Sequence, residues 1–220
     1  MIGVPGQSAP TITGFSLDMK AHIHRHLVET ARGLSAELAE GIAVAGPLAL
    51  PKPDARGLSV FLARAVIGQQ LSVKAARRIW GRVEEAAHAH GDHLLALLTE
   101  EHAPILKTCG VSSPKVQALL ALNAAEARGD LCPTRLRALT PEARTAHLCR
   151  IRGIGPWTGD MAAIFYFQEP DIWPDRDAAA NKAFRRLLRE GQSLAEAAAR
   201  FAPYRSFLAL HLWRWVDGAL

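Results

Sequence analysis

The segment 148–160, which reads LCRIRGIGPWTGD, constrains the fold more than any other part of this chain. It contains a Gly-x-Gly pair, Gly153 and Gly155, followed directly by Pro156. Glycines permit a tight turn and a close approach of the backbone to an anion, and proline is favoured at the first position of a helix. The segment therefore predicts two helices joined by a short hairpin, with the first N–H groups of the second helix open to an anion such as a phosphate.

A candidate carboxylate, Asp177, follows this hairpin in the sequence. Asp177 ends the loop 171–177, which is rich in acids and proline and contains Trp173, and a predicted helix begins directly after it. Aspartate at this position is a common N-cap, and the helix dipole favours its ionised form. Two interpretations of Asp177 remain open, a capping residue and a functional carboxylate, and they are compatible. Asp175 is the nearest alternative carboxylate.

The remainder of the chain has helical periodicity. Apolar residues recur at intervals of three or four between Ser16 and Ile42, with a break expected near Gly33. No run of alternating β-branched residues competes, so an all-α fold is expected. Residues 1–14 lack any period and are rich in Pro, Gly, Ser and Thr, which predicts a flexible tail before a domain spanning 15–220. Further helices are predicted at 58–67, 73–87, 94–99, 104–106, 112–122, 156–167, 178–190, 194–201 and 204–216, and another begins at Thr140.

Composition narrows the class of protein. The chain of 220 residues is 49% hydrophobic and 21% charged, and no apolar run approaches the roughly 20 residues that a membrane-spanning helix needs. No secretory signal is evident at the N-terminus, and three cysteines cannot all pair with one another, so an intracellular setting is expected, in the cytoplasm and nucleoid or in a nucleus. The wide spacing of the cysteines argues against a zinc or iron–sulfur site.

Positive charge is concentrated in one segment. The formal net charge is +5 and the pI is about 9.4, yet no acidic residue occurs between Asp54 and Glu84. This gap predicts a positive field around the turn 68–72, although a solvated helix face would also explain it. The basic residues of this segment are Arg56, Arg64, Lys74, Arg77, Arg78 and Arg82.

Together these motifs resemble the helix-hairpin-helix superfamily of DNA base-excision glycosylases, and within it the 3-methyladenine DNA glycosylase II family. Two further segments carry the resemblance. AVIGQQLS at 65–72 resembles the loop that fills the space left by an extruded nucleotide, and PYRS at 203–206 with LALHLW at 208–213 resembles the C-terminal helix. The resemblance runs from about Gly57 to Val216. It implies two helical lobes with a cleft between them, in a compact form without the N-terminal β-rich domain of longer members.

The resemblance also implies an activity. Such enzymes extrude a damaged nucleotide from duplex DNA and hydrolyse its N-glycosidic bond to start base excision repair, here with 3-methyladenine and 7-methylguanine as the expected bases. Asp177 matches the catalytic aspartate of the family, because it begins a helix and precedes an aromatic residue, Phe184, by seven positions. Trp157 stands where bifunctional relatives carry a lysine that forms an imine with the sugar. A monofunctional enzyme without lyase activity is therefore expected.

Other residues take roles by the same resemblance. Trp157 and Trp213 match aromatic residues of the base pocket, and Trp173 could join them; an indole face attracts a cationic purine by roughly 0.5–2 kcal/mol. Gln70 matches the side chain inserted into the duplex, called the wedge here, with Gln69 and Leu71 as alternatives. The glutamines could equally well only close a turn between two helices.

The hairpin is expected to bind DNA phosphate through Gly153, Gly155 and Thr158. In the family it commonly holds a monovalent cation through backbone carbonyls, and the corresponding Na⁺ or K⁺ ligands here belong to Cys149, Ile151 and Ile154. No other cofactor is expected. The histidines at 22, 24, 26, 88, 90 and 93 are interpreted as solvated surface.

The expected partner is duplex DNA with damaged bases, bound by a monomer away from any membrane. Two other functions remain. A lesion-sensing or architectural DNA-binding protein would use the hairpin and the wedge but would need Asp177 only as a cap. A bifunctional glycosylase and lyase would need a reactive amine, for which Lys182 is the nearby candidate.

Overall fold

The computed structural model describes residues 16–91 and 93–216, and every regular element within these ranges is a helix. The all-α prediction is confirmed. The expected tail at 1–14 lies outside the described residues. No helix within the described ranges has the length and apolar character needed to cross a membrane.

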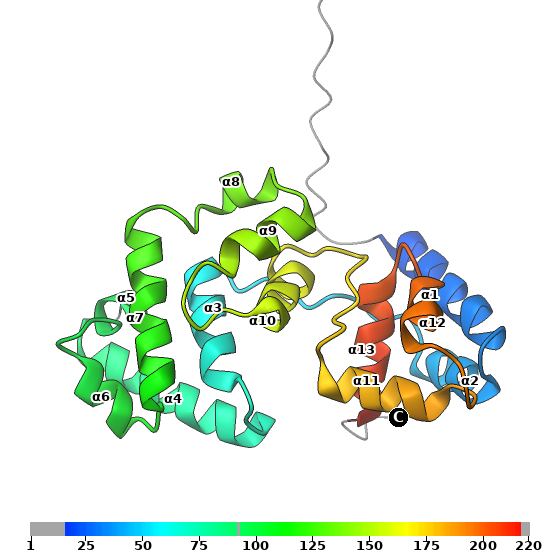
Figure 1. Ribbon diagram of the computed structural model, residues 1–220, viewed down its shortest axis with the longest axis horizontal. Helices are drawn as coiled ribbons and strands as arrows, with labels where there is room; N and C mark the ends of the chain where they lie inside the picture. The colour runs from blue at the N-terminus through cyan, green and yellow to red at the C-terminus, as the bar shows by residue number, and fades with distance from the viewer. Residues whose placement is uncertain (1–15, 92, 217–220) are drawn as a thin grey trace, which may run out of the picture.

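The helices form two lobes (Figure 1). The hairpin lobe has one hydrophobic core, and the terminal lobe, which joins the first and last helices of the described chain, has another. The hairpin lobe contains α3 (Leu58–Gly68), α4 (Val73–Ala89), α5 (Leu94–Leu97), α6 (Ala103–Thr108), α7 (Ser113–Ala127), α8 (Pro133–Arg137) and α9 (Pro141–Leu148). The terminal lobe contains α1 (Leu17–Arg32), α2 (Ala36–Ala45), α11 (Ala178–Leu187), α12 (Leu194–Ala199) and α13 (Arg205–Val216).

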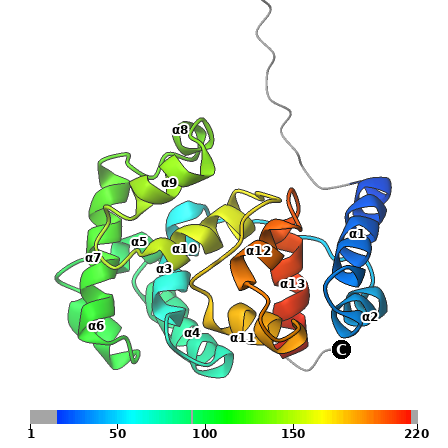
Figure 2. The same cartoon turned by 45° about the vertical axis from the view of Figure 1, so that its right-hand side comes forward.

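The second helix of the hairpin lies at the centre of the molecule and connects the lobes (Figure 2). It begins as α10 (Pro156–Met161) and continues as the π-helix η1 (Ala162–Tyr166). Met161 and Ile164 belong to the core of the terminal lobe, whereas Ala162 and Tyr166 belong to the core of the hairpin lobe. A single α-helix was expected over 156–167. The structure instead widens to π-helix geometry where the segment packs into both cores.

Side-chain caps stand at the starts of several of the predicted helices. The Ser72 hydroxyl accepts a hydrogen bond from the Ala75 N–H at 3.2 Å, and Thr140 accepts one from Ala143 at 3.2 Å. Gly33 ends α1 as predicted. Ser112 occupies the N-cap position of α7, but its side chain makes no capping hydrogen bond. The short helix α8 was not predicted, because five residues are too few for a periodic signal.

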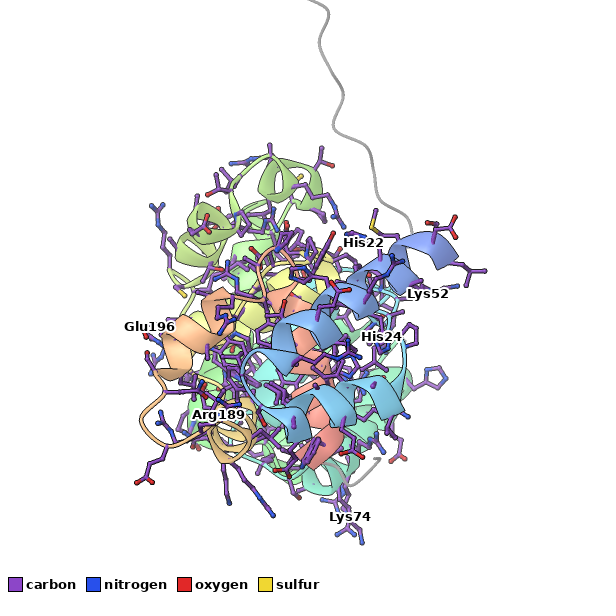
Figure 3. All side chains as sticks on the ribbon, turned by 90° about the vertical axis from the view of Figure 1, so that its right-hand side faces the viewer. His22, His24, Lys52, Lys74, Arg189 and Glu196 are labelled. Atoms are coloured by element: carbon purple, nitrogen blue, oxygen red, sulfur yellow. The ribbon has the colours of Figure 1, made fainter. Side chains whose placement is uncertain are left out.

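The interpretation of the histidines needs a correction on α1. The histidines at 22, 88, 90 and 93 are exposed, but His24 and His26 are half-buried because α1 packs beside α13. The His24 ring lies 6.3 Å from the ring of the buried His211 on α13, and the His26 ring lies 5.3 Å from Tyr204. Figure 3 shows α1 from the side, with His22 and His24 labelled.

Candidate active site

Asp177 lies where the loop after η1 meets α11. Its side chain is 8% exposed, and its Oδ1 accepts a hydrogen bond from the Ala180 N–H at 2.8 Å. Asp177 is therefore the N-cap of α11, as the sequence predicted. A carboxylate in this position also receives the favourable end of the helix dipole.

Two tryptophans complete the surroundings of this carboxylate. The Trp157 indole N–H on α10 donates to Asp177 Oδ2 at 2.8 Å, and the Trp213 indole N–H on α13 donates to Oδ1 at 3.0 Å. Three N–H donors from three helices thus converge on one side chain. Hydrogen bonds to a carboxylate stabilise its negative charge and fix its orientation. The arrangement can stabilise a cation beside it or orient a water molecule.

The loop that precedes Asp177 is hydrogen-bonded to the start of α13. The Arg205 guanidinium donates to both oxygens of Asp171, with Nε at 2.7 Å and Nη2 at 3.0 Å. The Ser206 hydroxyl donates to the Glu169 carbonyl at 2.7 Å and accepts from the Ile172 N–H at 3.0 Å. Sequence reasoning had placed Arg205 and Ser206 in a C-terminal motif without giving them a task. Their task is to hold the loop 169–177 in place.

The third predicted pocket aromatic, Trp173, has a different environment. Its ring packs edge-to-face against Phe184, with centroids 5.4 Å apart, and Phe184 is fully buried. Asp177 and Phe184 thus belong to the same helix, α11. Asp177 is its N-cap, and Phe184 in its second turn packs against Trp173 of the preceding loop.

The other carboxylates near the hairpin are placed less favourably than Asp177. Asp175 is exposed. Asp160 on α10 is half-buried, and burial raises its pKa to about 6, assisted by the negative charge of Asp175 and opposed by Arg176. A carboxyl group with a pKa of about 6 is partly protonated near neutral pH, so Asp160 is poorly suited to act as a permanent anion.

The two glycines of the hairpin have different surroundings. Gly153 has φ +84°, and a Cβ at this position would lie 2.2 Å from the Ala118 Cβ on α7. Gly155 faces open space, which leaves room for a ligand to approach the backbone. Thr158 is 1% exposed, and its hydroxyl accepts a hydrogen bond from the Gln69 side-chain amide at 3.0 Å.

The three carbonyls expected to hold a cation belong to the same hairpin. The Ile151 carbonyl accepts a hydrogen bond from the Ile154 N–H at 3.0 Å, which closes the turn. Cys149 ends α9 as its C-cap. A carbonyl oxygen has two lone pairs, so the bond at Ile151 leaves one for a cation.

The predicted wedge residues separate into two environments. Gln69 is half-buried, and its side-chain amide donates to the Gly153 carbonyl at 3.0 Å and to the Thr158 hydroxyl at 3.0 Å. Gln70 is exposed in a left-handed conformation with φ +56°, and Leu71 is 39% exposed. Gln69 therefore faces the hairpin, and Gln70 and Leu71 form the outer edge of the turn between α3 and α4.

The basic segment is mostly open to solvent. Arg56 is also exposed, but it is ion-paired with Asp54 at 2.9 Å and with Glu84 at 2.6 Å. The other five basic residues of the segment are exposed: Arg64, Lys74, Arg77, Arg78 and Arg82. A positive surface therefore flanks the turn 68–72, the wedge turn, with one unpaired charge fewer than the sequence suggested.

Comparison with known proteins places the chain in a family. No protein-family model matches it. DNA-3-methyladenine glycosylase 1 of Schizosaccharomyces pombe is 30% identical over 160 residues, which cover 70% of this chain and 70% of the relative. The chain belongs to the DNA-3-methyladenine glycosylase family. Further bacterial relatives are longer, and the chain spans 33%, 57% and 55% of their lengths.

Solved structures support the same placement. A 3-methyladenine DNA glycosylase from Schizosaccharomyces pombe in complex with abasic DNA has a TM-score of 0.75 at 24% identity, covering 89% of this chain and 97% of that one. A DNA-3-methyladenine glycosidase from Bacillus halodurans has a TM-score of 0.68 at 27% identity, covering 86% and 88%. The predicted family and the helix-hairpin-helix fold are confirmed.

Proposed function

We propose that this protein is a monofunctional DNA glycosylase that hydrolyses the N-glycosidic bond of alkylated purines, 3-methyladenine and 7-methylguanine, in duplex DNA. Membership of the family supports the substrate class. The observation that carries the proposal is the buried Asp177 carboxylate with its three N–H donors. A site built only for DNA binding would gain nothing from a negative charge held in this way.

The proposed role of Asp177 follows from the reaction. As the bond between base and sugar breaks, positive charge develops on the sugar, and a fixed carboxylate stabilises it more than bulk water does. The oxygen of a water molecule bonds to the sugar carbon and releases a proton to the solvent, and the base leaves with the electrons of the broken bond. A purine methylated at N3 or N7 is already cationic and departs as a neutral base, so the step needs no acid to protonate it.

Support for hydrolysis without strand cleavage comes from Trp157. Its indole occupies the position of the imine-forming lysine in bifunctional relatives, and its N–H is engaged by Asp177. An indole nitrogen cannot form an imine with the sugar. Lys182, the amine proposed for the alternative mechanism, is exposed on α11.

The indole edges of Trp157 and Trp213 face Asp177, and we assign their ring faces to the base. Stacking and cation–π attraction would then select a cationic purine beside the carboxylate. Trp173 would border this pocket while its own ring packs on Phe184.

The proposed DNA contacts lie in the hairpin and the wedge turn. Backbone N–H groups at Gly153, Gly155 and Thr158 would bind a phosphate, and Gln70 with Leu71 would enter the duplex. A Na⁺ or K⁺ ion on the carbonyls of Cys149, Ile151 and Ile154 would add positive charge to the hairpin, and no other cofactor is required. The protein would act as a monomer on damaged duplex DNA.

The test uses purified protein and duplex DNA treated with a methylating agent. We expect release of free methylpurines, strand breaks that appear only after alkali, and no covalent product on borohydride reduction. The Lys182→Ala variant should behave as wild type. DNA binding without release would instead indicate the lesion-sensing function, and a borohydride adduct lost in Lys182→Ala would indicate a lyase.

A further inference from the structure

Hydrogen bonds from the Gln69 side chain join the wedge turn to the hairpin. Gln69 lies 84 residues before Gly153 and 89 residues before Thr158, yet its amide nitrogen donates to both at 3.0 Å. A side-chain amide has two N–H bonds, so both donors of Gln69 are committed to the hairpin. The two DNA-facing features of the proposed function are thus linked directly.

Both acceptors of Gln69 are held rigidly. Thr158 is 1% exposed, within the first turn of α10. Gly153 is confined by its φ of +84° and by the close approach of Ala118 on α7. The hairpin is therefore rigid where Gln69 binds it, so its two acceptors fix the position of the Gln69 side chain.

The backbone of Gln69 is held by a side chain of α7, within the same lobe. The Lys115 ammonium on α7 donates to the carbonyls of Ile67 and Gln69, both at 2.8 Å. Burial lowers the pKa of Lys115, because its half-buried ammonium group has lost part of its hydration. Gln69 is thereby fixed at its side chain and at its backbone, and the exposed Gln70 follows immediately with φ +56°.

We propose that Gln69 is a positioning residue that holds the wedge turn at a set distance from the phosphate-binding hairpin. This inference rests on the proposed function, in which the hairpin binds the strand and Gln70 enters it. Two contacts on one strand act together only if their spacing matches the DNA. Because the spacing is already fixed in the free protein, ordering the turn does not reduce the free energy of DNA binding.

The main test compares a paired with an unpaired lesion, because the wedge is needed to open a base pair. Gln69→Met keeps the length of the side chain but removes both donors. With 7-methylguanine opposite cytosine, we expect the single-turnover rate of base release to fall about tenfold, the effect of losing two neutral hydrogen bonds. With the same base opposite an abasic site, the rate should stay within about twofold of wild type. Equal falls on both substrates, or no fall on either, would overturn the inference.

Control variants separate positioning from stability. Gln117→Met makes the same change at an exposed position on α7 and should leave both rates unchanged. Gln69→Glu keeps the shape of the side chain without a donor and provides a second variant if the methionine disturbs folding. Thr158→Val removes one acceptor, so its effect and that of Gln69→Met should be less than additive when combined.

A readout that needs no base release keeps the inference separate from the proposed activity. A duplex with 2-aminopurine beside an abasic site reports insertion of the wedge as a change in fluorescence. Wild type should give the change and Gln69→Met a smaller one at saturating protein. If wild type inserts but releases no methylpurine, the proposed function fails and the inference on Gln69 stands. An identical signal from both proteins would contradict the inference.

Discussion

The carboxylate site and the wedge turn are organised in opposite ways. Asp177 is buried and receives hydrogen bonds from Trp157, Trp213 and Ala180, which belong to three helices. Gln70 and Leu71 are exposed, and the contacts that fix their turn come from behind, through Gln69 and Lys115. The first region presents a charge from inside the protein, whereas the second presents side chains to the outside.

This difference matches the role proposed for each region. A charge that must stabilise a reacting centre is most effective when its donors are fixed before the substrate arrives. A side chain that enters a duplex must be accessible, so only its support can be buried. The hairpin serves both regions, because it begins α10, which carries Trp157, and because it accepts the hydrogen bonds of Gln69.

The largest expected effect concerns the rigidity of the hairpin. Gly153→Ala should lower the free energy of unfolding by about 3 kcal/mol, because the left-handed backbone and the overlap with Ala118 both oppose a Cβ. Gly155→Ala, which faces open space, should change it by less than about 0.5 kcal/mol. Denaturant unfolding of the two variants measures this directly. Equal unfolding free energies would mean that the hairpin adjusts to a Cβ at position 153. The hairpin would then not be a rigid support for the carboxylate site and the wedge turn.

The tryptophans test how strongly the carboxylate site depends on its donors. Trp157→Phe and Trp213→Phe should each lower the single-turnover rate about tenfold, and the double variant about a hundredfold, because each loses one hydrogen bond to a charged group. Trp80→Phe, in the core of the hairpin lobe, serves as the control for a lost indole. Wild-type rates in the double variant would show that stacking alone accounts for both residues.

A pH effect should appear in the terminal lobe. Burial lowers the pKa of His211 to about 4, assisted by His24 and Arg214. Because the unfolded chain binds a proton at a higher pH than the folded one, this group costs stability as the pH falls, by about 2 kcal/mol between pH 7 and pH 5. Asp160 acts in the opposite direction, since its raised pKa favours the folded state as the pH falls through about 6. The measurement is therefore the difference in unfolding free energy between wild type and His211→Gln, which should narrow on acidification. A constant difference would contradict the assignment.

The smallest expected effect concerns the support of the wedge turn. Lys115→Met should lower base release from a paired lesion about fivefold while leaving an unpaired lesion unaffected, because the carbonyls of Ile67 and Gln69 lose a charged donor. Lys107→Met, an exposed lysine on α6, is the matched control. A fall of the same size in both variants would point to lost positive charge in place of lost support.

Local signals were enough to predict most of the helices and the position of Asp177. The helix over 73–87 and the one that begins at Thr140 were predicted at the right places, because a capping side chain such as that of Ser72 bonds to an N–H only three positions away. Asp177 was predicted as a cap and as the candidate carboxylate, and the structure shows the cap. The catalytic role of Asp177 stays a prediction until it is measured.

Contacts between distant segments could not be predicted in the same way. The alternatives for the wedge included Gln69 because nothing nearby in the sequence shows that its amide meets Gly153 and Thr158. His24 and His26 looked like surface because their burial depends on α13, which lies far along the chain. The π-helix after Met161 also follows from packing into two cores, which no local pattern encodes.

The most direct test of the role of Asp177 compares Asp177→Asn with Asp175→Asn. Asparagine at 177 can still cap α11 but carries no charge, and Asp175 is an exposed acid two residues earlier. We expect Asp177→Asn to lose at least about a hundredfold in single-turnover base release while its DNA affinity stays within a few-fold of wild type, and Asp175→Asn to retain activity. Base release by Asp177→Asn at the wild-type rate would contradict the central role of this carboxylate.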